Sequence, residues 1–120
     1  MDQEIIALNL ISNSGNARSL SFEALQKARE GKYDEAKELV KKAEESSLLA
    51  HKAQTELIQA EANGNTPEYS IIMVHAQDHL MTSLLAKDLI QEMIMMYEKI
   101  NKWYISLFRN LIKENNFKAK

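Results

Sequence analysis

Apolar residues recur three or four positions apart along most of the chain, and this spacing divides it into three segments. The first runs from about Glu4 to Arg29, the second from about Asp34 to Ala62, and the third from about Thr66 past Ile100. Such spacing places the apolar side chains on one face of an α-helix. The sequence has only three glycines and one proline in 120 residues, so it predicts an all-α fold, an antiparallel three-helix bundle with a long C-terminal helix.

The breaks between the segments contain residues that favour helix ends. Gly31 is placed to end the first helix, because glycine readily adopts the left-handed conformation that closes many helices. The sequence Asn63-Gly64-Asn65 ends the second helix in the same way. Thr66-Pro67-Glu68 then predicts the start of the third helix, with an N-cap, a first-turn proline and a first-turn acid.

Small and polar side chains mark the first two segments. The run from Ser12 to Asn16 contains poor residues for a helix interior, which predicts either a local bend or small side chains that line a site. In the second segment, His51 and Gln54 are expected to form hydrogen bonds within the bundle. A seam at seven-residue spacing in that segment predicts close packing against a neighbouring helix. Its members are Ala36, Ala43, Ala50 and Leu57.

The third segment has two apolar directions, although a helix in a three-helix bundle needs only one. One direction contains Val74, Met81 and Leu85, and the other contains Met73, Leu80 and Leu84. The second apolar direction predicts self-association. The expected contact is the face that contains Val74, and Asp78 lies inside it. A closed symmetric oligomer would bring copies of Asp78 together, and their repulsion would require a proton or a cation between them.

The third segment continues into an amphipathic, basic and aromatic stretch. We assign residues 1–100 to the bundle domain and residues 101–120 to an extension of its third helix. From Lys99 onward there are six basic residues and one acid, a charge of +5, so the preceding chain carries −7 of the total of −2. Packing within an assembly is the expected role of this stretch, and contact with a membrane surface is the alternative.

Composition excludes several classes of function. The chain has no cysteine, which excludes disulfides, thiolate metal sites and a cysteine nucleophile. The acidic body argues against nucleic-acid binding and suits a basic protein partner. The start Met1-Asp2-Gln3-Glu4 is unlike a signal peptide, and no apolar run reaches the ~20 residues of a membrane span. A soluble cytoplasmic protein is therefore expected.

His75, Asp78 and His79 are the candidate functional residues, inside the apolar stretch from Ile71 to Met81. In a helix the two histidines lie one turn apart on one face, and Asp78 is rotated away from them by ~60° to 100°. Three interpretations follow: a zinc site, a pair of inert hydrogen-bonded histidines, or a nucleophilic imidazole that carries a group covalently. The chain has no glycine-rich phosphate loop, so direct binding of ATP is not expected.

Four blocks carry a resemblance to a known family, and they occur in the order Gly15-Asn16-Ala17-Arg18-Ser19, Phe22-Glu23-Ala24-Leu25, Ala50-His51-Lys52-Ala53-Gln54-Thr55-Glu56-Leu57-Ile58 and His75-Ala76-Gln77-Asp78-His79-Leu80-Met81. In these blocks the chain resembles the enzyme IIA component of the lactose/cellobiose (chitobiose) family of the bacterial phosphoenolpyruvate-dependent sugar phosphotransferase system. The resemblance runs from about Glu4 to Tyr97.

The resemblance implies a homotrimeric phosphocarrier that serves sugar uptake. It would accept a phosphoryl group from the protein HPr and pass it to a cysteine of the IIB component, and so act indirectly on the IIC transporter. His75 would carry the phosphoryl group and His79 would assist it, with Gln54 as a neighbouring polar contact. Asp78 would bind a divalent cation such as Mg²⁺ at the trimer axis.

Two other classes of function stay open, a non-catalytic helical scaffold or regulatory homologue and a histidine-based metal-binding protein. The histidine chemistry does not specify the sugar among cellobiose, chitobiose and lactose, and a β-glucoside such as cellobiose is the weak preference. The tail after about Ile100 is longer and more apolar than the resemblance implies, so its role is a separate question.

Overall fold

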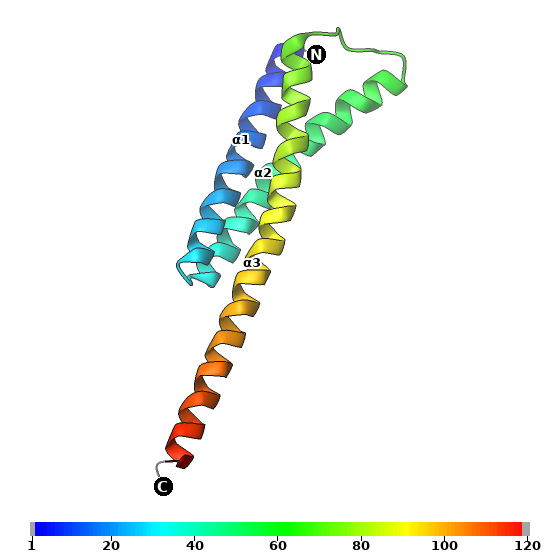
Figure 1. The fold of residues 1–120 in the computed structure, drawn as a ribbon. Coiled ribbons are helices and arrows are strands. Elements are labelled where there is room, and N and C mark those ends of the chain that lie inside the picture. The colour runs from blue at the N-terminus through cyan, green and yellow to red at the C-terminus, as the bar shows by residue number, and fades with distance from the viewer. Residues whose placement is uncertain (1, 119–120) are drawn as a thin grey trace.

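The computed structural model describes residues 2–118, which form three α-helices (Figure 1). Helix α1 spans Gln3–Arg29, α2 spans Tyr33–Ala62 and α3 spans Ile71–Lys118. The predicted all-α fold is confirmed, and the first two helices begin and end within one residue of the expected positions. In Figure 1, α1 and α2 form a hairpin, and α3 runs back along it and continues well past the turn between them. The molecule is therefore long and thin, 81 × 21 × 20 Å.

Both predicted helix ends are confirmed by their backbone conformation. Gly31 has φ +77° and Gly64 has φ +87°, the region that side chains with a Cβ rarely adopt. After α1, the Lys32 N–H donates to the Lys27 carbonyl at 2.9 Å, which satisfies one of the last carbonyls of the helix.

The predicted start of α3 at Thr66 is wrong. The helix begins at Ile71, and the Ser70 hydroxyl accepts the Met73 N–H at 3.2 Å, so Ser70 does the capping that was expected of Thr66. Figure 1 shows the physical reason: the end of α2 diverges from α3, and the connection must cross that gap. An extended chain covers ~3.3 Å per residue against ~1.5 Å in a helix, so residues 65–70 span the gap only outside a helix.

The core follows from small side chains on α1 and α2. Helix α1 packs along both other helices, whereas α2 and α3 meet over a shorter length. The predicted alanine seam of α2 is confirmed, because all four of its members are buried. Two apolar clusters result. One contains Ala7, Leu10, Ala50, Leu57, Met73, Ala76 and Leu80, and the other contains Ala24, Leu25, Ala28, Ala36, Ile90 and Ile94.

Buried polar groups come from all three helices. Ser14, Ser47 and Ser83 are buried, one from each helix, and their hydroxyls have no hydrogen-bond partner in the described residues. Helix α1 runs without interruption through its small-residue stretch, where the Asn16 amide donates to the Ser46 hydroxyl at 2.7 Å. The small side chains of this stretch therefore serve the contact between α1 and α2.

Lys87 is a buried cation, only 6% exposed. Its Nζ lies 2.8 Å from a carboxylate oxygen of Glu44 on α2, and 3.7 Å from Asp88. A buried ammonium group without a partner is costly, so the Glu44 contact ties α3 to α2 where few other contacts join them.

We predict that Glu44→Ala lowers the free energy of unfolding by about 1.5–3 kcal/mol, the usual worth of a hydrogen bond to a charged group. Urea denaturation at fixed protein concentration measures it. Glu45→Ala is the matched control, because Glu45 is an exposed neighbour on the same helix. Equal stability of the two variants would contradict the structural role of the Lys87 pair.

Candidate functional site

His75 and His79 face each other on α3, as their spacing predicts. Their Nε2 atoms are 3.0 Å apart, and the ring centroids are 4.4 Å apart with the planes at 82°. The distance is that of a hydrogen bond between two ring nitrogens. The two imidazoles therefore act as one unit at the surface.

The buried side of α3 holds this unit in place. Met73, Ala76 and Leu80 all lie in the apolar core, which fixes the rotation of the helix about its axis. His75 consequently points outward and is exposed, and His79 is partly exposed. A large partner therefore has direct access to His75.

The hydrogen bond between the rings restricts their tautomers. A neutral imidazole has one N–H and one lone pair, so one Nε2 must donate and the other must accept. When His79 donates, the Nε2 lone pair of His75 is unprotonated, which is the form that attacks an electrophile. The opposite tautomer leaves the lone pair on His79 instead, so in either case the pair presents one unprotonated Nε2 beside one Nε2–H donor.

Asp78 lies apart from the histidines on the outside of the protomer. Its side chain is exposed among the exposed Val74 and Leu85. Residues 2–118 of a single chain contain no group of three His, Cys, Asp or Glu side chains that could hold a metal ion. The interpretation of His75, Asp78 and His79 as one zinc site therefore gains no support, and a metal at Asp78 would need ligands from other copies of the chain.

Gln54 forms a hydrogen bond within the bundle, as predicted. Its amide nitrogen donates to the Gln77 side-chain oxygen at 2.7 Å. Gln77 is two residues from His75, so the two side chains leave the helix about 160° apart. Gln54 is thus directed away from the imidazole pair of its own chain. The side chain of His51 is exposed.

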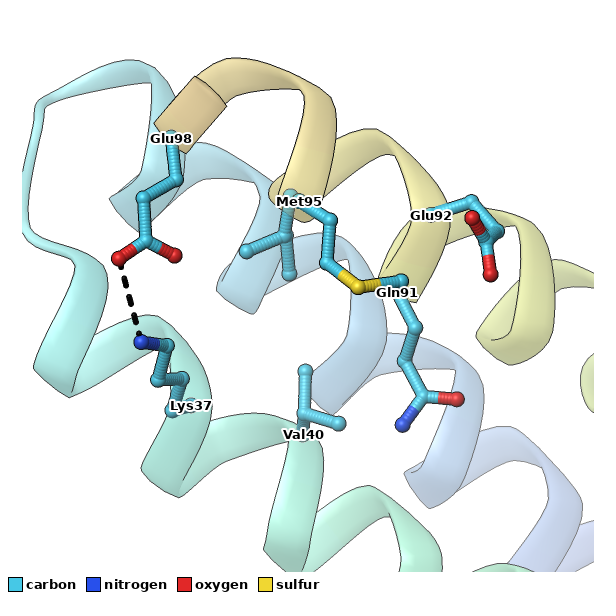
Figure 2. Close-up of a pocket in the computed structure, with 7 residues that line it drawn as sticks. Lys37, Val40, Gln91, Glu92, Met95 and Glu98 are labelled. Atoms are coloured by element: carbon cyan, nitrogen blue, oxygen red, sulfur yellow. Dashed lines mark hydrogen bonds and ion pairs between the residues drawn. The ribbon is translucent and has the colours of Figure 1, made fainter. Parts of the chain in front are cut away.

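A groove lined by residues of α2 and α3 lies away from the histidines (Figure 2). It has a volume of about 300 Å³ and lies between α2 and α3, where Lys37 Nζ is 3.3 Å from Glu98 Oε1. Val40 and Met95 also line it, and neither histidine does. The imidazole pair instead occupies an open helix surface, an arrangement that suits transfer between proteins better than enclosure of a small substrate.

Comparison with known sequences places these features in a family. The sequence model described as "PTS system, Lactose/Cellobiose specific IIA subunit" matches residues 5–98. This chain belongs to that family. It is 45% identical over 96 residues to the lactose-specific EIIA component of Staphylococcus epidermidis, which covers 80% of this chain and 92% of the relative. The resemblance found in the four sequence blocks is thereby confirmed, and the chain is a IIA component of the phosphotransferase system.

Solved structures agree with the fold of this IIA subunit. The cellobiose-specific enzyme IIA of Bacillus anthracis is 49% identical with a TM-score of 0.82, over 85% of this chain and 94% of that chain. IIA(Chitobiose) of Escherichia coli, solved as a complex with HPr, is 40% identical with a TM-score of 0.73, over 84% of this chain and 98% of that chain. The family match ends at residue 98, so the last part of α3 lies outside it.

We predict that the Nε2 of exactly one of the two paired histidines carries a proton when both rings are neutral. Nitrogen-detected NMR of the imidazoles, at a pH above the ordinary histidine range, measures this directly. His79→Ala should release His75 to a mixture of both tautomers, while His51→Ala, at an exposed histidine on α2, should leave it unchanged. An unaltered tautomer of His75 in the His79→Ala variant would contradict the hydrogen bond.

Proposed function

We propose that His75 of this IIA subunit accepts a phosphoryl group from phospho-HPr and donates it to a cysteine of the IIB component. The transfer would take place in the cytoplasm and serve the uptake of a disaccharide of the cellobiose, chitobiose or lactose type. The observation that carries the proposal is the exposed His75 with its Nε2 held 3.0 Å from that of His79.

Each transfer exchanges one bond to phosphorus for another. In the first, the Nε2 lone pair of His75 forms a bond to phosphorus as the bond to HPr breaks. In the second, that N–P bond breaks as the sulfur of the IIB cysteine bonds to phosphorus. Such transfers pass through a loose transition state, so alignment and charge stabilisation are the protein's main task. The Nε2–H of His79 is placed to donate to a phosphoryl oxygen.

The exposed surface around His75 supports an exchange between two protein partners. HPr and IIB must reach the same nitrogen in turn, and the neighbouring Ile71, Ile72 and Thr82 are all exposed. The Escherichia coli relative was solved bound to HPr, which supports HPr as the donor here. The IIC transporter would be served only through IIB.

We predict that His75→Ala abolishes labelling by radioactive phospho-HPr, because it removes the attacking nitrogen. His79→Ala should slow labelling roughly 10- to 100-fold, the worth of one charge-assisted hydrogen bond. The measurement is the rate at which acid-labile phosphate appears on the protein.

His51→Ala is the matched control for this assay, since it removes an exposed histidine outside the pair. Its labelling rate should equal that of the wild type. Labelling that survives His75→Ala would refute the assignment. If the wild type takes up no label at all, the chain is instead a non-catalytic scaffold or regulatory homologue.

The assembly proposed with this function is a homotrimer whose α3 helices surround a common axis. Asp78 is a lone carboxylate between the exposed apolar side chains Val74 and Leu85. Burying this charge in an apolar contact between chains costs free energy unless a cation neutralises it. Three copies of Asp78 would present oxygen ligands of the type that Mg²⁺ prefers. The cation would supply charge neutralisation at the axis and take no part in phosphoryl transfer.

We predict that Asp78→Leu removes the bound divalent cation and leaves a trimer at least as stable as the wild type, because an apolar contact replaces a buried charge. Native mass spectrometry with metal analysis measures both quantities. Glu56→Leu is the control, since Glu56 is an exposed acid on α2. Metal content that Asp78→Leu leaves unchanged would rule out the axial site.

A further inference from the structure

The face of α3 that contains Asp78 continues as one exposed apolar stripe as far as Leu111. We call it the outer stripe. All of its apolar members are at least 42% exposed in the protomer. They are Leu85, Leu89, Met93, Met96, Ile100, Tyr104, Leu107 and Leu111.

The outer stripe repeats every eleven residues. Asp78 is followed at this interval by Leu89, Ile100 and Leu111. The same interval relates Leu85, Met96 and Leu107, and it also relates Thr82, Met93 and Tyr104. Eleven residues complete slightly more than three full turns, so residues at this interval drift only about 20° around a straight helix per repeat. A nearly straight bundle of identical helices keeps such a stripe at its centre throughout.

The stripe crosses the end of the bundle without a break. The hydroxyl of Tyr33 donates to the Tyr97 carbonyl at 3.4 Å, and Lys37 pairs with Glu98, close to where the α1–α2 hairpin ends. All residues from 99 to 116 are exposed, and Figure 1 shows this part of α3 projecting alone. A solitary helix with this much apolar surface needs a partner.

Three cations of the projecting helix lie away from the stripe. Lys102, Arg109 and Lys113 leave the helix about 120° to 180° around from Ile100 and Leu107. In a self-associated bundle these cations would face water. On a membrane surface the same division of faces would insert the stripe and leave the cations on the polar side, so the charge pattern fits both occupants. The continuity of the stripe with the Asp78 face of the bundle is what favours copies of the same helix.

We propose that residues 99–114 of three copies of this chain pack in parallel through the outer stripe into a stalk that extends the trimer beyond the family's bundle. The inference rests on the proposed homotrimer, because it continues the axis that Asp78 defines. The occupant of the exposed stripe is thus a second and a third copy of the same helix, in the same register. In that register each Leu107 lies beside its own copies, and so does each Leu111.

Cross-linking tests this register in the full-length chain, which has no cysteine of its own. Leu107→Cys is treated with a short bis-maleimide at low protein concentration. Ile105→Cys is the matched control, because Ile105 is 45% exposed against 43% for Leu107 but lies on the other side of the helix. We expect linked chain pairs to be the main product for Leu107→Cys, and at least several-fold fewer for Ile105→Cys.

A pair of charge substitutions provides a second measurement. Leu107→Glu with Leu111→Glu should lower the midpoint of thermal unfolding and make it more dependent on protein concentration. Ile105→Glu with Ile112→Glu, at residues of similar exposure, should change it much less. Equal cross-linking of the two cysteine variants, or equal effects of the two charged pairs, would overturn the stalk.

The outcomes also separate the stalk from its alternatives. Equal cross-linking in a protein that still accepts phosphate on His75 refutes the stalk and leaves the proposed function intact. Selective cross-linking in a protein that takes up no phosphate refutes the function and leaves the stalk. Flotation of the wild type with phosphatidylserine vesicles at low salt, lost in the Leu107→Glu, Leu111→Glu variant, would show that the occupant is a membrane and overturn the proposal.

Discussion

The close packing of α1 against both other helices is the contact on which the rest of the structure depends. Alanines and serines on α1 and α2 let these helices approach closely, and α1 then covers a single face of α3. Because Met73, Ala76 and Leu80 are fixed in that contact, every other side chain of α3 has a set direction. An α-helix turns about 100° per residue, so one buried face determines which residues reach the surface and where.

Helix α3 therefore has three distinct faces: the buried face in the core, the face with the two histidines, and the face with Asp78. His75 points to open solvent with the partly exposed His79 beside it, so the pair is accessible from outside the protomer. Asp78 lies about 60° away from His75, on a face that suits copies of the same chain. For the proposed phosphocarrier this separation would be an advantage, since a carboxylate beside His75 would repel an incoming phosphoryl group, whereas at the proposed trimer axis a cation would neutralise it.

Much of this arrangement was open to prediction from the sequence. The helical spacing of the apolar residues predicted three helices, and the glycines predicted two of their ends, at Gly31 and at Asn63-Gly64-Asn65. The seven-residue spacing in α2 predicted that its alanine seam is buried. The histidine pair followed from its four-residue spacing, because both members belong to one helix. Predictions of this kind succeed where the residues concerned are local, and the four sequence blocks added the family. The predicted start of α3 was wrong, because its position depends on the gap between the end of α2 and the beginning of α3 and not on Thr66-Pro67 itself.

The sequence by itself thus determined the helices, the family and the nucleophile candidate, since these depend on local periodicity and on residue identity. Only the tertiary structure decided the partners across helices. Lys87 meets Glu44, and Gln54 meets Gln77 on the side of α3 away from the histidines. The outer apolar direction of α3 was predictable, because Asp78 lies in it: Val74, Met81 and Leu85 are exposed, whereas Met73 and Leu80 are buried. Which side chains meet across helices was not, because such contacts join distant segments of the chain and no local pattern records them.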